Sequence, residues 1–340
     1  MRSNSLKIAV LGAGSWGTSL AILLSKKGFD VTLWDRNEGR VKHLQTSRIN
    51  EKYLPKIELP VSLNLTSDLL GLARKSDVII LGTPSHTIRE IVGQIKTEIS
   101  KNTILVNLAK GIENQTLLTM SGVIRDAHPE ISDSQIVALY GPSHAEEVSK
   151  DMPTTLVSAS KDLETAKYVQ ELFITPFLRV YSNSDLIGVE IGGSIKNVMA
   201  IATGILDGMN FGDNAKAALL TRGINEITRM GVALGARKET FAGLTGIGDL
   251  IVTCMSKHSR NRYLGEQIGK GKCLDQVLAE MVMVAEGVKT TRSTRDLSLK
   301  LGIDMPITES VYSVLFENKS PKQAVFELMT RSAKEEEWGS

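Results

Sequence analysis

The sequence predicts an α/β amino-terminal domain, residues 1–184, followed by an all-α carboxy-terminal domain, residues 185–340. In the first half, short apolar runs rich in β-branched residues alternate with helical patterns, as they do in βαβ units around a parallel sheet. Beyond about Asp185 such runs almost vanish, and apolar residues recur at helical spacing. A length of 340 residues also favours two domains over one.

Each strand expected in the first half is an apolar run closed by Gly, Pro, Asn or Asp. The runs are Lys7–Leu11, Val31–Trp34, Val78–Leu81, Ile104–Asn107 and Ile136–Leu139. A helix is expected to follow the first run and to continue to about Lys27. In the second half, helices are expected over Leu186–Leu206, over Ala215–Leu234 and from Leu274 onward. The last residues, 333–340, are expected to form a solvated tail.

The composition excludes several classes of protein. Hydrophobic residues make up 42% of the chain and charged residues 23%, which excludes wholesale disorder. Lys and Arg number 40 against 38 Asp and Glu, whereas a nucleic-acid-binding protein would show a clustered basic excess. Cys254 and Cys273 form no CxxC pair and the histidines form no HxxH pattern, so neither a disulfide nor a metal site is expected. No run reaches the ~18 apolar residues of a membrane helix, so we expect a cytoplasmic protein without a membrane span.

A glycine-rich turn follows the first apolar run directly and opens the expected helix. It reads Gly12-Ala13-Gly14-Ser15-Trp16-Gly17. In the GxGxxG pattern the first glycine permits the tight turn, the second lets the backbone approach a pyrophosphate, and the third packs the helix against the strand. The helix amino terminus would then face the diphosphate. The order of strand, motif and helix therefore predicts a Rossmann-like dinucleotide-binding domain.

The second run ends in Trp34-Asp35-Arg36, where an acidic residue accepts hydrogen bonds from the adenosine ribose. Asp35 favours NAD, because its carboxylate would bind a free 2′-hydroxyl and repel a 2′-phosphate. Arg36 favours NADP, because its guanidinium can pair with that phosphate. A surface acid–base pair is the alternative interpretation. We expect the protein to use both NAD and NADP, and the sequence does not rank them.

One expected helix carries a lone Lys196 among small and apolar residues, in Gly192-Gly193-Ser194-Ile195-Lys196-Asn197. A charged lysine in such surroundings must reach water, find a partner or lose its proton. Gly192 and Gly193 lie on the same helix face as Lys196 and would leave room for a small ligand. A partly desolvated lysine is a plausible general acid/base. The alternative is a lysine that extends to solvent at a tight helix crossing.

Two later segments add polar groups. Asp249 is flanked by glycines and could orient Lys196 or a substrate hydroxyl, or simply cap a helix. Ser259, Arg260 and Asn261 together supply the hydroxyl, guanidinium and amide donors that bind a phosphate monoester. The alternative for this second segment is a solvated surface.

Several motifs together resemble NAD(P)-dependent glycerol-3-phosphate dehydrogenases of the bacterial type. The motifs are Gly193-Ser194-Ile195-Lys196-Asn197-Val198-Met199-Ala200 with Gly204 and Asp207-Gly208, then Ser259-Arg260-Asn261-Arg262, Gly141-Pro142-Ser143-His144-Ala145, Ala109-Lys110-Gly111 and Ala285-Glu286-Gly287. The resemblance covers nearly the whole chain. It implies a Rossmann-like domain followed by an all-helical domain of the 6-phosphogluconate-dehydrogenase type, with the active site between them. It also implies reversible, metal-free reduction of dihydroxyacetone phosphate to sn-glycerol 3-phosphate, which supplies glycerophospholipid synthesis.

The same resemblance assigns roles residue by residue. Lys196 would be the catalytic acid/base. The substrate contacts would be Lys110, Gly141, Ser143, Asp249, Ser259, Arg260 and Asn261. The cofactor contacts would be Ser15, Trp16, Arg36, Lys110, Ala145, Arg260, Val284 and Glu286, in addition to Gly12, Gly14, Gly17 and Asp35 of the nucleotide motif. Asp35 departs from what an enzyme committed to NADP would carry.

Two other functions stay open at this point. Another two-domain dehydrogenase acting on a hydroxy acid or sugar acid would share the nucleotide half, although the Ser259–Arg262 segment and Lys110 argue against it. A non-enzymatic dinucleotide sensor would keep the glycine-rich turn but would have no use for Lys196 and Asp249. A methyltransferase fits the remaining motifs poorly. The apolar helical half favours a homodimer.

Overall fold

The structure is a computed structural model that describes residues 6–281, 283–333 and 336. The chain divides into two compact units. The sheet unit comprises the residues up to Lys110 together with Met120–Leu186, and the helical unit comprises Gly111–Thr119 together with the residues from Ile187 onward. The tail expected over residues 333–340 lies outside the described residues, except for residues 333 and 336.

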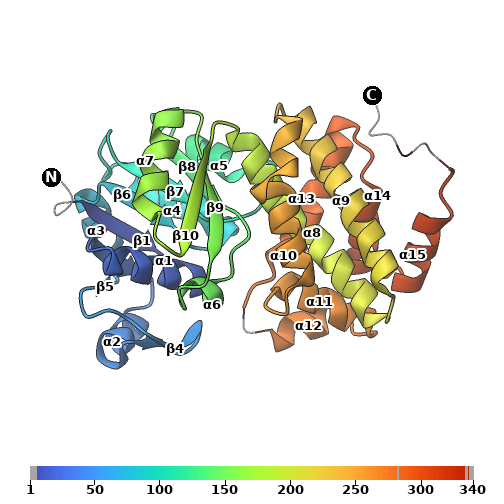
Figure 1. Ribbon diagram of the computed structural model, residues 1–340, viewed down its shortest axis with the longest axis horizontal. Helices are drawn as coiled ribbons and strands as arrows, with labels where there is room; N and C mark the ends of the chain where they lie inside the picture. The colour runs from blue at the N-terminus through green and yellow to red at the C-terminus, as the bar shows by residue number, and fades with distance from the viewer. Residues whose placement is uncertain (1–5, 282, 334–335, 337–340) are drawn as a thin grey trace. The chain divides into compact units, whose positions relative to one another are not determined.

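An eight-stranded sheet forms the centre of the sheet unit in the described part of the chain, with the strand order β10-β9-β8-β7-β6-β1-β2-β5. The strands are β1 (Lys7–Leu11), β2 (Asp30–Trp34), β5 (Asn64–Thr66), β6 (Val78–Leu81), β7 (Ile104–Asn107), β8 (Ile136–Tyr140), β9 (Thr154–Ala159) and β10 (Leu178–Asn183). All five predicted strands are thus confirmed. Helices cover both faces of the sheet (Figure 1), which is why its central strands consist of uninterrupted apolar residues.

The sheet differs from the prediction at both edges. Strand β5, at one edge, has three residues and was not predicted. Strands β9 and β10, at the other edge, were not predicted either, because both mix polar with apolar residues instead of forming a continuous apolar run. Strand β9 also runs antiparallel to β8, whereas the other neighbouring strands pair in parallel. The carboxyl end of β9 therefore lies beside the amino end of β8.

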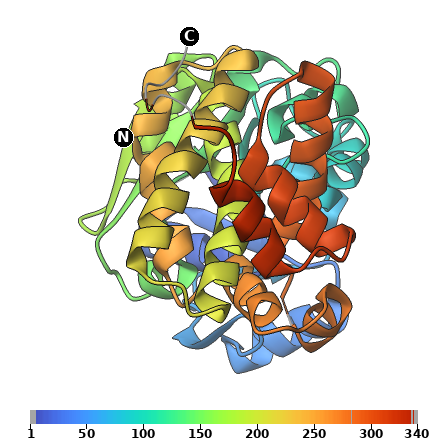
Figure 2. The same ribbon diagram turned by 90° about the vertical axis from the view of Figure 1, so that its right-hand side faces the viewer.

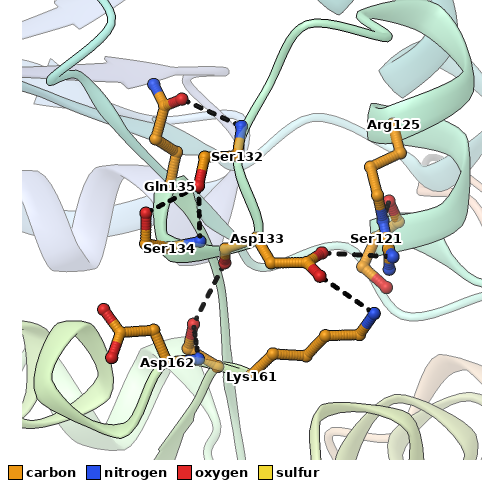
Figure 3. Close-up of polar contacts among 9 residues, drawn as sticks. Ser121, Arg125, Ser132, Asp133, Ser134, Gln135, Lys161 and Asp162 are labelled. Atoms are coloured by element: carbon orange, nitrogen blue, oxygen red, sulfur yellow. Dashed lines mark hydrogen bonds and ion pairs between the residues drawn. The ribbon is translucent and has the colours of Figure 1, made fainter.

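Figure 3 shows a polar cluster at the amino end of β8, where the antiparallel strand β9 ends. Asp133, in the short helix η2 (Asp133–Gln135), lies between Arg125 and Lys161, with nitrogen–oxygen distances of 3.1 Å to each. Lys161 follows β9, so this ion-pair cluster joins segments distant in sequence. It lies at the amino end of β8, whereas open α/β sheets bind ligands at the carboxyl ends of their strands.

The first helix of the sheet unit confirms the expected start of the nucleotide motif, because α1 spans Ser15–Lys26 and follows β1 after a short turn. Strand β1 lies between β2 and β6, so the strand order reverses there, and the carboxyl ends of β1 and β6 are adjacent. The other helices of this unit are α2 (Glu38–Ser47), α3 (Leu69–Lys75), α4 (Ile88–Ile95), α5 (Met120–Ala127), α6 (Ala145–Val148) and α7 (Leu163–Phe173). A two-stranded hairpin, β3 (Ile49–Asn50) and β4 (Leu54–Glu58), follows α2.

Helices make up the core of the second unit. They are α8 (Leu186–Gly208), α9 (Asp213–Ala233), α10 (Asp249–Met255), α11 (Arg260–Gly269), α12 (Leu274–Glu280), α13 (Glu286–Leu301), α14 (Pro306–Phe316) and α15 (Pro321–Met329). Figure 2 shows α8 in yellow-green among the later helices. In the described residues α8 is the one helix long and apolar enough to cross a membrane, and 94% of its apolar window is buried inside the fold. Its apolar character is therefore that of a core helix.

Helices α8 and α11 cross at glycines on both sides. A Cβ added at Gly204 or Gly208 of α8 would overlap the backbone of α11, and a Cβ added at Gly265 or Gly269 of α11 would overlap the backbone of α8. The two backbones therefore lie in direct contact, and this contact fixes the start of α11 relative to α8.

One short segment belongs to the helical unit although it lies far from it in sequence. Gly111–Thr119 leaves the sheet unit directly after Lys110, and Ile112 and Thr119 form an isolated β-bridge. Ile112 is part of the apolar core of the helical unit. This excursion could not be predicted from the sequence, because a segment so short carries no periodicity of its own.

Candidate active site

The three glycines of the nucleotide motif occupy three different environments. Gly12 has φ +114°, and an added Cβ would lie 2.9 Å from the backbone of Gly82. A Cβ at Gly17 would overlap the carbonyl oxygen of Gly12, so this glycine packs α1 against the turn. A Cβ at Gly14 would meet no atom within 4 Å. The turn thus combines a left-handed residue, a close helix contact and an open space beside its middle glycine.

The same turn leaves the amino terminus of α1 suited to an anion. Gly14 is the N-cap residue and supplies no side-chain cap, and the twelve-residue helix begins with Ser15 and Trp16, which are both partly buried. The amides of the first turn and the positive end of the helix dipole attract negative charge. The open space beside Gly14 therefore fits the diphosphate of a dinucleotide.

Asp35 lies at the end of β2, as predicted, but its carboxylate already has protein partners. It is 5% exposed, forms an ion pair with Arg40 of α2, and accepts a hydrogen bond from the backbone N–H of Asn37 at 2.9 Å. The neighbouring Arg36 is exposed. Asp35 thus forms a buried ion pair with Arg40, which differs from the surface pair with Arg36 that was considered as the alternative. Arg40 was not predicted as the partner of Asp35. Their contact depends on helix α2, which was not predicted.

Lys110, Gly141 and Ser143 come together after the carboxyl ends of β7 and β8. Lys110 Nζ and Ser143 Oγ each donate to the carbonyl oxygen of Gly141, at 3.2 Å in both cases. Lys110 Nζ also lies 5.5 Å from the ring centroid of Tyr140. The sequence placed these side chains at this edge of the sheet, and the structure brings them into contact.

Two residues that were not predicted as functional, Asn107 and Tyr140, stabilise the loop that carries Lys110. Asn107 Nδ2 donates to the hydroxyl of Tyr140 at 2.8 Å and to the carbonyl oxygen of Ala109 at 3.0 Å. The Tyr140 hydroxyl also donates to that carbonyl. A hydrogen-bonded pair in β7 and β8 thus fixes the loop that carries Lys110. Ala145 begins α6, and its carbonyl oxygen accepts from Ser19 Oγ of α1 at 3.2 Å.

Lys196 is buried in the helical unit and has two polar partners on α10. Its side chain is 6% exposed, forms an ion pair with the fully buried Asp249, and donates to Thr253 Oγ1 at 2.6 Å. The structure therefore decides against a lysine that extends to solvent. Thr253 was missed, although its position one helical turn after Asp249 is a spacing that sequence can show.

The approach of α10 to α8 depends on Gly192. A Cβ at this position would overlap the backbone carbonyl of Thr245 in η4 (Leu244–Gly248), a π-helical turn that leads directly into α10. The space beside Gly192 is thus filled by protein backbone, and the expected room for a ligand there is not found. The close contact instead brings Asp249, the first residue of α10, to Lys196.

Cys254, next to Thr253, is a fully buried thiol. Burial raises its pKa to about 12, with a smaller opposing effect from a hydrogen bond to Thr203. The thiol stays protonated at neutral pH and is therefore not a nucleophile. Among the described residues, no group of three or more His, Cys, Asp or Glu side chains is arranged to hold a metal ion.

The expected phosphate-binding residues form the start of α11. Ser259 is its N-cap residue, and its Oγ accepts from the backbone N–H of Arg262 at 3.2 Å. Arg260 is exposed at the first position of the helix. Ser259 and Asn261 are buried, and both side chains are engaged inside the protein, which the sequence analysis did not anticipate.

Asn261 joins three helices. Its Nδ2 donates to Asn197 Oδ1 of α8 at 3.0 Å, and its Oδ1 accepts from the backbone N–H of Gly287 in α13 at 2.9 Å. Gly287 follows Glu286, the first residue of α13, and Val284 is exposed two residues before Glu286. The side-chain amide of Asn261 therefore links Asn197, which is next to Lys196, with the starts of α11 and α13.

Comparison with known proteins gives a consistent result for both units. Residues 7–166 match the family model described as NAD-dependent glycerol-3-phosphate dehydrogenase N-terminus, and residues 185–326 match that of the C-terminus. The chain is 55% identical over 334 residues to glycerol-3-phosphate dehydrogenase (NAD(P)+) 2 of Salinibacter ruber, covering 98% of this chain and 97% of the relative. It is 52% identical to glycerol-3-phosphate dehydrogenase (NAD(P)+) of Chlorobium phaeobacteroides, covering 97% of this chain and 99% of the relative.

A solved structure is also similar. The crystal structure of glycerol-3-phosphate dehydrogenase from Coxiella burnetii superposes with a TM-score of 0.91 at 37% identity, covering 96% of this chain and 99% of that one. The similarity extends over both units and confirms the predicted fold class, a Rossmann-like domain followed by a helical domain.

Proposed function

Because the chain belongs to the NAD-dependent glycerol-3-phosphate dehydrogenase family, we propose that it catalyses the reversible, NAD(P)H-dependent reduction of dihydroxyacetone phosphate to sn-glycerol 3-phosphate. The observation that carries the proposal within the structure is the buried Lys196, held by Asp249 and Thr253. We assign dinucleotide binding to residues 1–184 and the acid/base and phosphate-binding groups to residues 185–340. The product would supply glycerophospholipid synthesis in the cytoplasm.

Lys196 acts in this proposal on the carbonyl oxygen of the substrate. When bound, a nicotinamide would supply the hydride to the carbonyl carbon and would accept it in the reverse direction. The Lys196 ammonium stabilises the negative charge that develops on the oxygen and then gives it a proton. Asp249 forms an ion pair with the lysine, and Thr253 fixes the position of Nζ. In the oxidation direction Lys196 accepts the proton.

Arg260 binds the substrate phosphate in this proposal, assisted by Ser259 and Asn261. An exposed guanidinium at the first position of α11 can bind a phosphate through two parallel hydrogen bonds, and the helix amino terminus adds to the attraction. Binding energy from this remote group orients the reacting carbon. We assign Lys110, Gly141, Ser143 and Asp249 as further substrate contacts.

The turn from Gly12 to Gly17 binds the cofactor diphosphate, since its glycines give the required close approach. The ribose edge is formed by Asp35 and Arg36. We assign the remaining cofactor contacts to Ser15, Trp16, Lys110, Ala145, Arg260, Val284 and Glu286. Either NAD or NADP is accepted, no metal takes part, and the active form is a homodimer.

The test is oxidation of NADH or NADPH, followed by absorbance, on addition of dihydroxyacetone phosphate to the purified protein. Lys196→Met is expected to lower kcat severely with a small change in KM, whereas Lys300→Met, at an exposed position of α13, is expected to leave both unchanged. Wild-type turnover in Lys196→Met would remove the lysine from the mechanism.

The phosphate site has a separate test. Arg260→Ala is expected to raise KM for dihydroxyacetone phosphate by a factor on the order of 100, as expected for loss of a charge-assisted pair. Activity with dihydroxyacetone, which lacks the phosphate, serves as the control and is expected to stay at its low wild-type value. An unchanged KM would contradict the assignment of Arg260.

A further inference from the structure

We infer that Asn50 is a positioning residue of the dinucleotide-binding turn, which it holds through the carbonyl group of Ala13. The inference rests on the proposed function, because the turn matters only if a dinucleotide binds there. Asn50 ends β3, in the hairpin that follows α2, and no motif of the sequence drew attention to it.

The contacts of Asn50 converge on the glycine-rich turn and the helix it opens. Asn50 is 2% exposed, and its Nδ2 donates to the carbonyl oxygen of Ala13 at 3.0 Å and to Thr18 Oγ1 at 2.8 Å. Ala13 lies between the first two glycines of the motif, and Thr18 follows the third. A single amide group thus connects the turn, the first part of α1 and the β3–β4 hairpin.

Arg40 supplies a second donor to the same carbonyl oxygen. Its Nη2 lies 3.4 Å from the Ala13 oxygen and also pairs with Asp35. The guanidinium in turn lies 4.9 Å from the ring centroid of Tyr53, in the same hairpin. The Ala13 carbonyl is therefore held from the side of α2 and the hairpin by two donors.

The planarity of the peptide bond turns this contact into a constraint on the binding face. In a trans peptide the C=O of one residue and the N–H of the next point in opposite directions. Because the Ala13 carbonyl points toward Asn50, the N–H of Gly14 points away from it. Gly14 is the residue beside which the turn is open and the N-cap of α1. Asn50 therefore keeps the Gly14 peptide in the orientation that presents an N–H for an anion.

The burial of Asn50 also favours a positioning role over simple packing. An amide removed from water costs free energy unless it is hydrogen-bonded, and an apolar side chain would fill the same space without that cost. The groups to which the amide donates explain its presence, and the backbone acceptor among them is the Ala13 carbonyl oxygen, at 3.0 Å.

Two variants of different charge test the inference. Asn50→Leu removes the donor at similar volume, and Asn50→Asp replaces the donor with a carboxylate oxygen facing the Ala13 carbonyl. The matched control is Asn64→Asp, because Asn64 is exposed on β5 and its Nδ2 donates only at the surface, to Asp30 at 3.2 Å. Asn50→Ser, too short to reach Ala13, replaces either variant if it fails to fold.

The readout is the Kd of NADH, ADP-ribose and adenosine for the full-length protein, measured without substrate. Loss of one hydrogen bond to the turn is expected to raise Kd about five- to tenfold for the two ligands that carry the diphosphate. The Kd of adenosine, kcat at saturating NADH and KM for dihydroxyacetone phosphate are expected to stay within about twofold of wild type.

Each outcome is distinct. A folded Asn50→Leu that binds both ADP-ribose and adenosine with the wild-type Kd overturns the inference. Weakening of both ligands by the same factor also overturns it, since that result indicates a general structural role. Failure of the wild-type protein to bind NADH would instead contradict the proposed function.

Discussion

Glu226 is a buried carboxylate whose titration we expect to control the stability of the helical unit. It lies on α9, is 1% exposed, and accepts hydrogen bonds from the backbone N–H groups of Ile307 and Thr308, at 2.6 and 3.2 Å. The Thr308 hydroxyl donates to it at 3.1 Å. These donors belong to the first turn of α14, whose own N-cap residue, Met305, gives no side-chain cap. Glu226 thus caps a helix that is distant in sequence.

The direction of the pH effect follows from the balance of burial and hydrogen bonding. Burial raises the pKa of Glu226 to about 7 and outweighs the hydrogen bonds from Ile307 and Thr308, which lower it. Between the ordinary value of 4.5 and about 7 the folded protein therefore binds a proton that the unfolded chain has lost. The free energy of unfolding then falls as pH rises through this window. The contribution is fully present below the lower value and lost above the upper one.

The size of the effect follows from the same two values. The difference between about 7 and 4.5, at about 1.36 kcal/mol per pH unit, gives about 3 kcal/mol. Glu226→Gln removes the titrating group while keeping its shape. The wild-type free energy of unfolding minus that of Glu226→Gln is therefore expected to decrease by about 3 kcal/mol between about pH 4 and about pH 8.

The assay is urea unfolding followed by far-ultraviolet circular dichroism at several pH values. Glu239→Gln, an exposed substitution in the same unit, serves as the control and is expected to show no such trend. A difference between wild type and Glu226→Gln that stays constant across this range, or that increases with pH, would refute the reasoning.

Three further predictions concern the α8–α11 crossing, the ribose edge and the buried ion pair. Gly204→Ala is expected to destabilise the protein by about 2 kcal/mol or more, because the new Cβ overlaps the backbone of α11. The control is Gly93→Ala in α4, where the added Cβ meets open space. It is expected to be neutral or stabilising, and thermal unfolding measures both variants. Arg40→Ala is expected to lower kcat/KM for NADPH relative to NADH about tenfold, because Asp35 loses its counter-charge, and an unchanged ratio would contradict this. The double variant Lys196→Met with Asp249→Leu is expected to be inactive, yet its free energy of unfolding is expected to lie within about 2 kcal/mol of the wild-type value. Asp249→Leu alone leaves a buried charge unpaired, so its free energy of unfolding in urea is expected to fall by about 3 kcal/mol or more.

The fold class could be predicted from the sequence because its central strands are buried on both faces. Such strands are continuous apolar runs, and β1, β6 and β7 coincide with the predicted ranges. The antiparallel direction of β9 could not be predicted, since it depends on the path of the chain around the sheet edge. The inclusion of Gly111–Thr119 in the helical unit depends likewise on contacts between segments distant in sequence.

The candidate site shows the same division between local and distant information. Lys196 stood out because a charged residue is unusual in an apolar helix, and Asp249 stood out between glycines. That the two are in contact depends on the backbone approach at Gly192, where the sequence suggested space for a ligand. Arg40 and Asn50 lie in ordinary polar segments, and their contacts with Asp35 and Ala13 become evident only from the folded chain.

The free-energy cost of burying the Lys196–Asp249 ion pair bears on the role of the pair. Removing two charges from water costs several kcal/mol per ion, and well-packed apolar residues at such sites are often as stable or more stable. Stability alone therefore does not explain a buried ion pair inside the apolar core that surrounds α8. The proton transfer proposed above would explain it, because that reaction needs a proton donor that is held in place beside the substrate oxygen. The close backbone contact at Gly192 and the hydrogen bond from Lys196 to Thr253 hold the pair in place, so the proposed mechanism depends on the packing of α10 on α8.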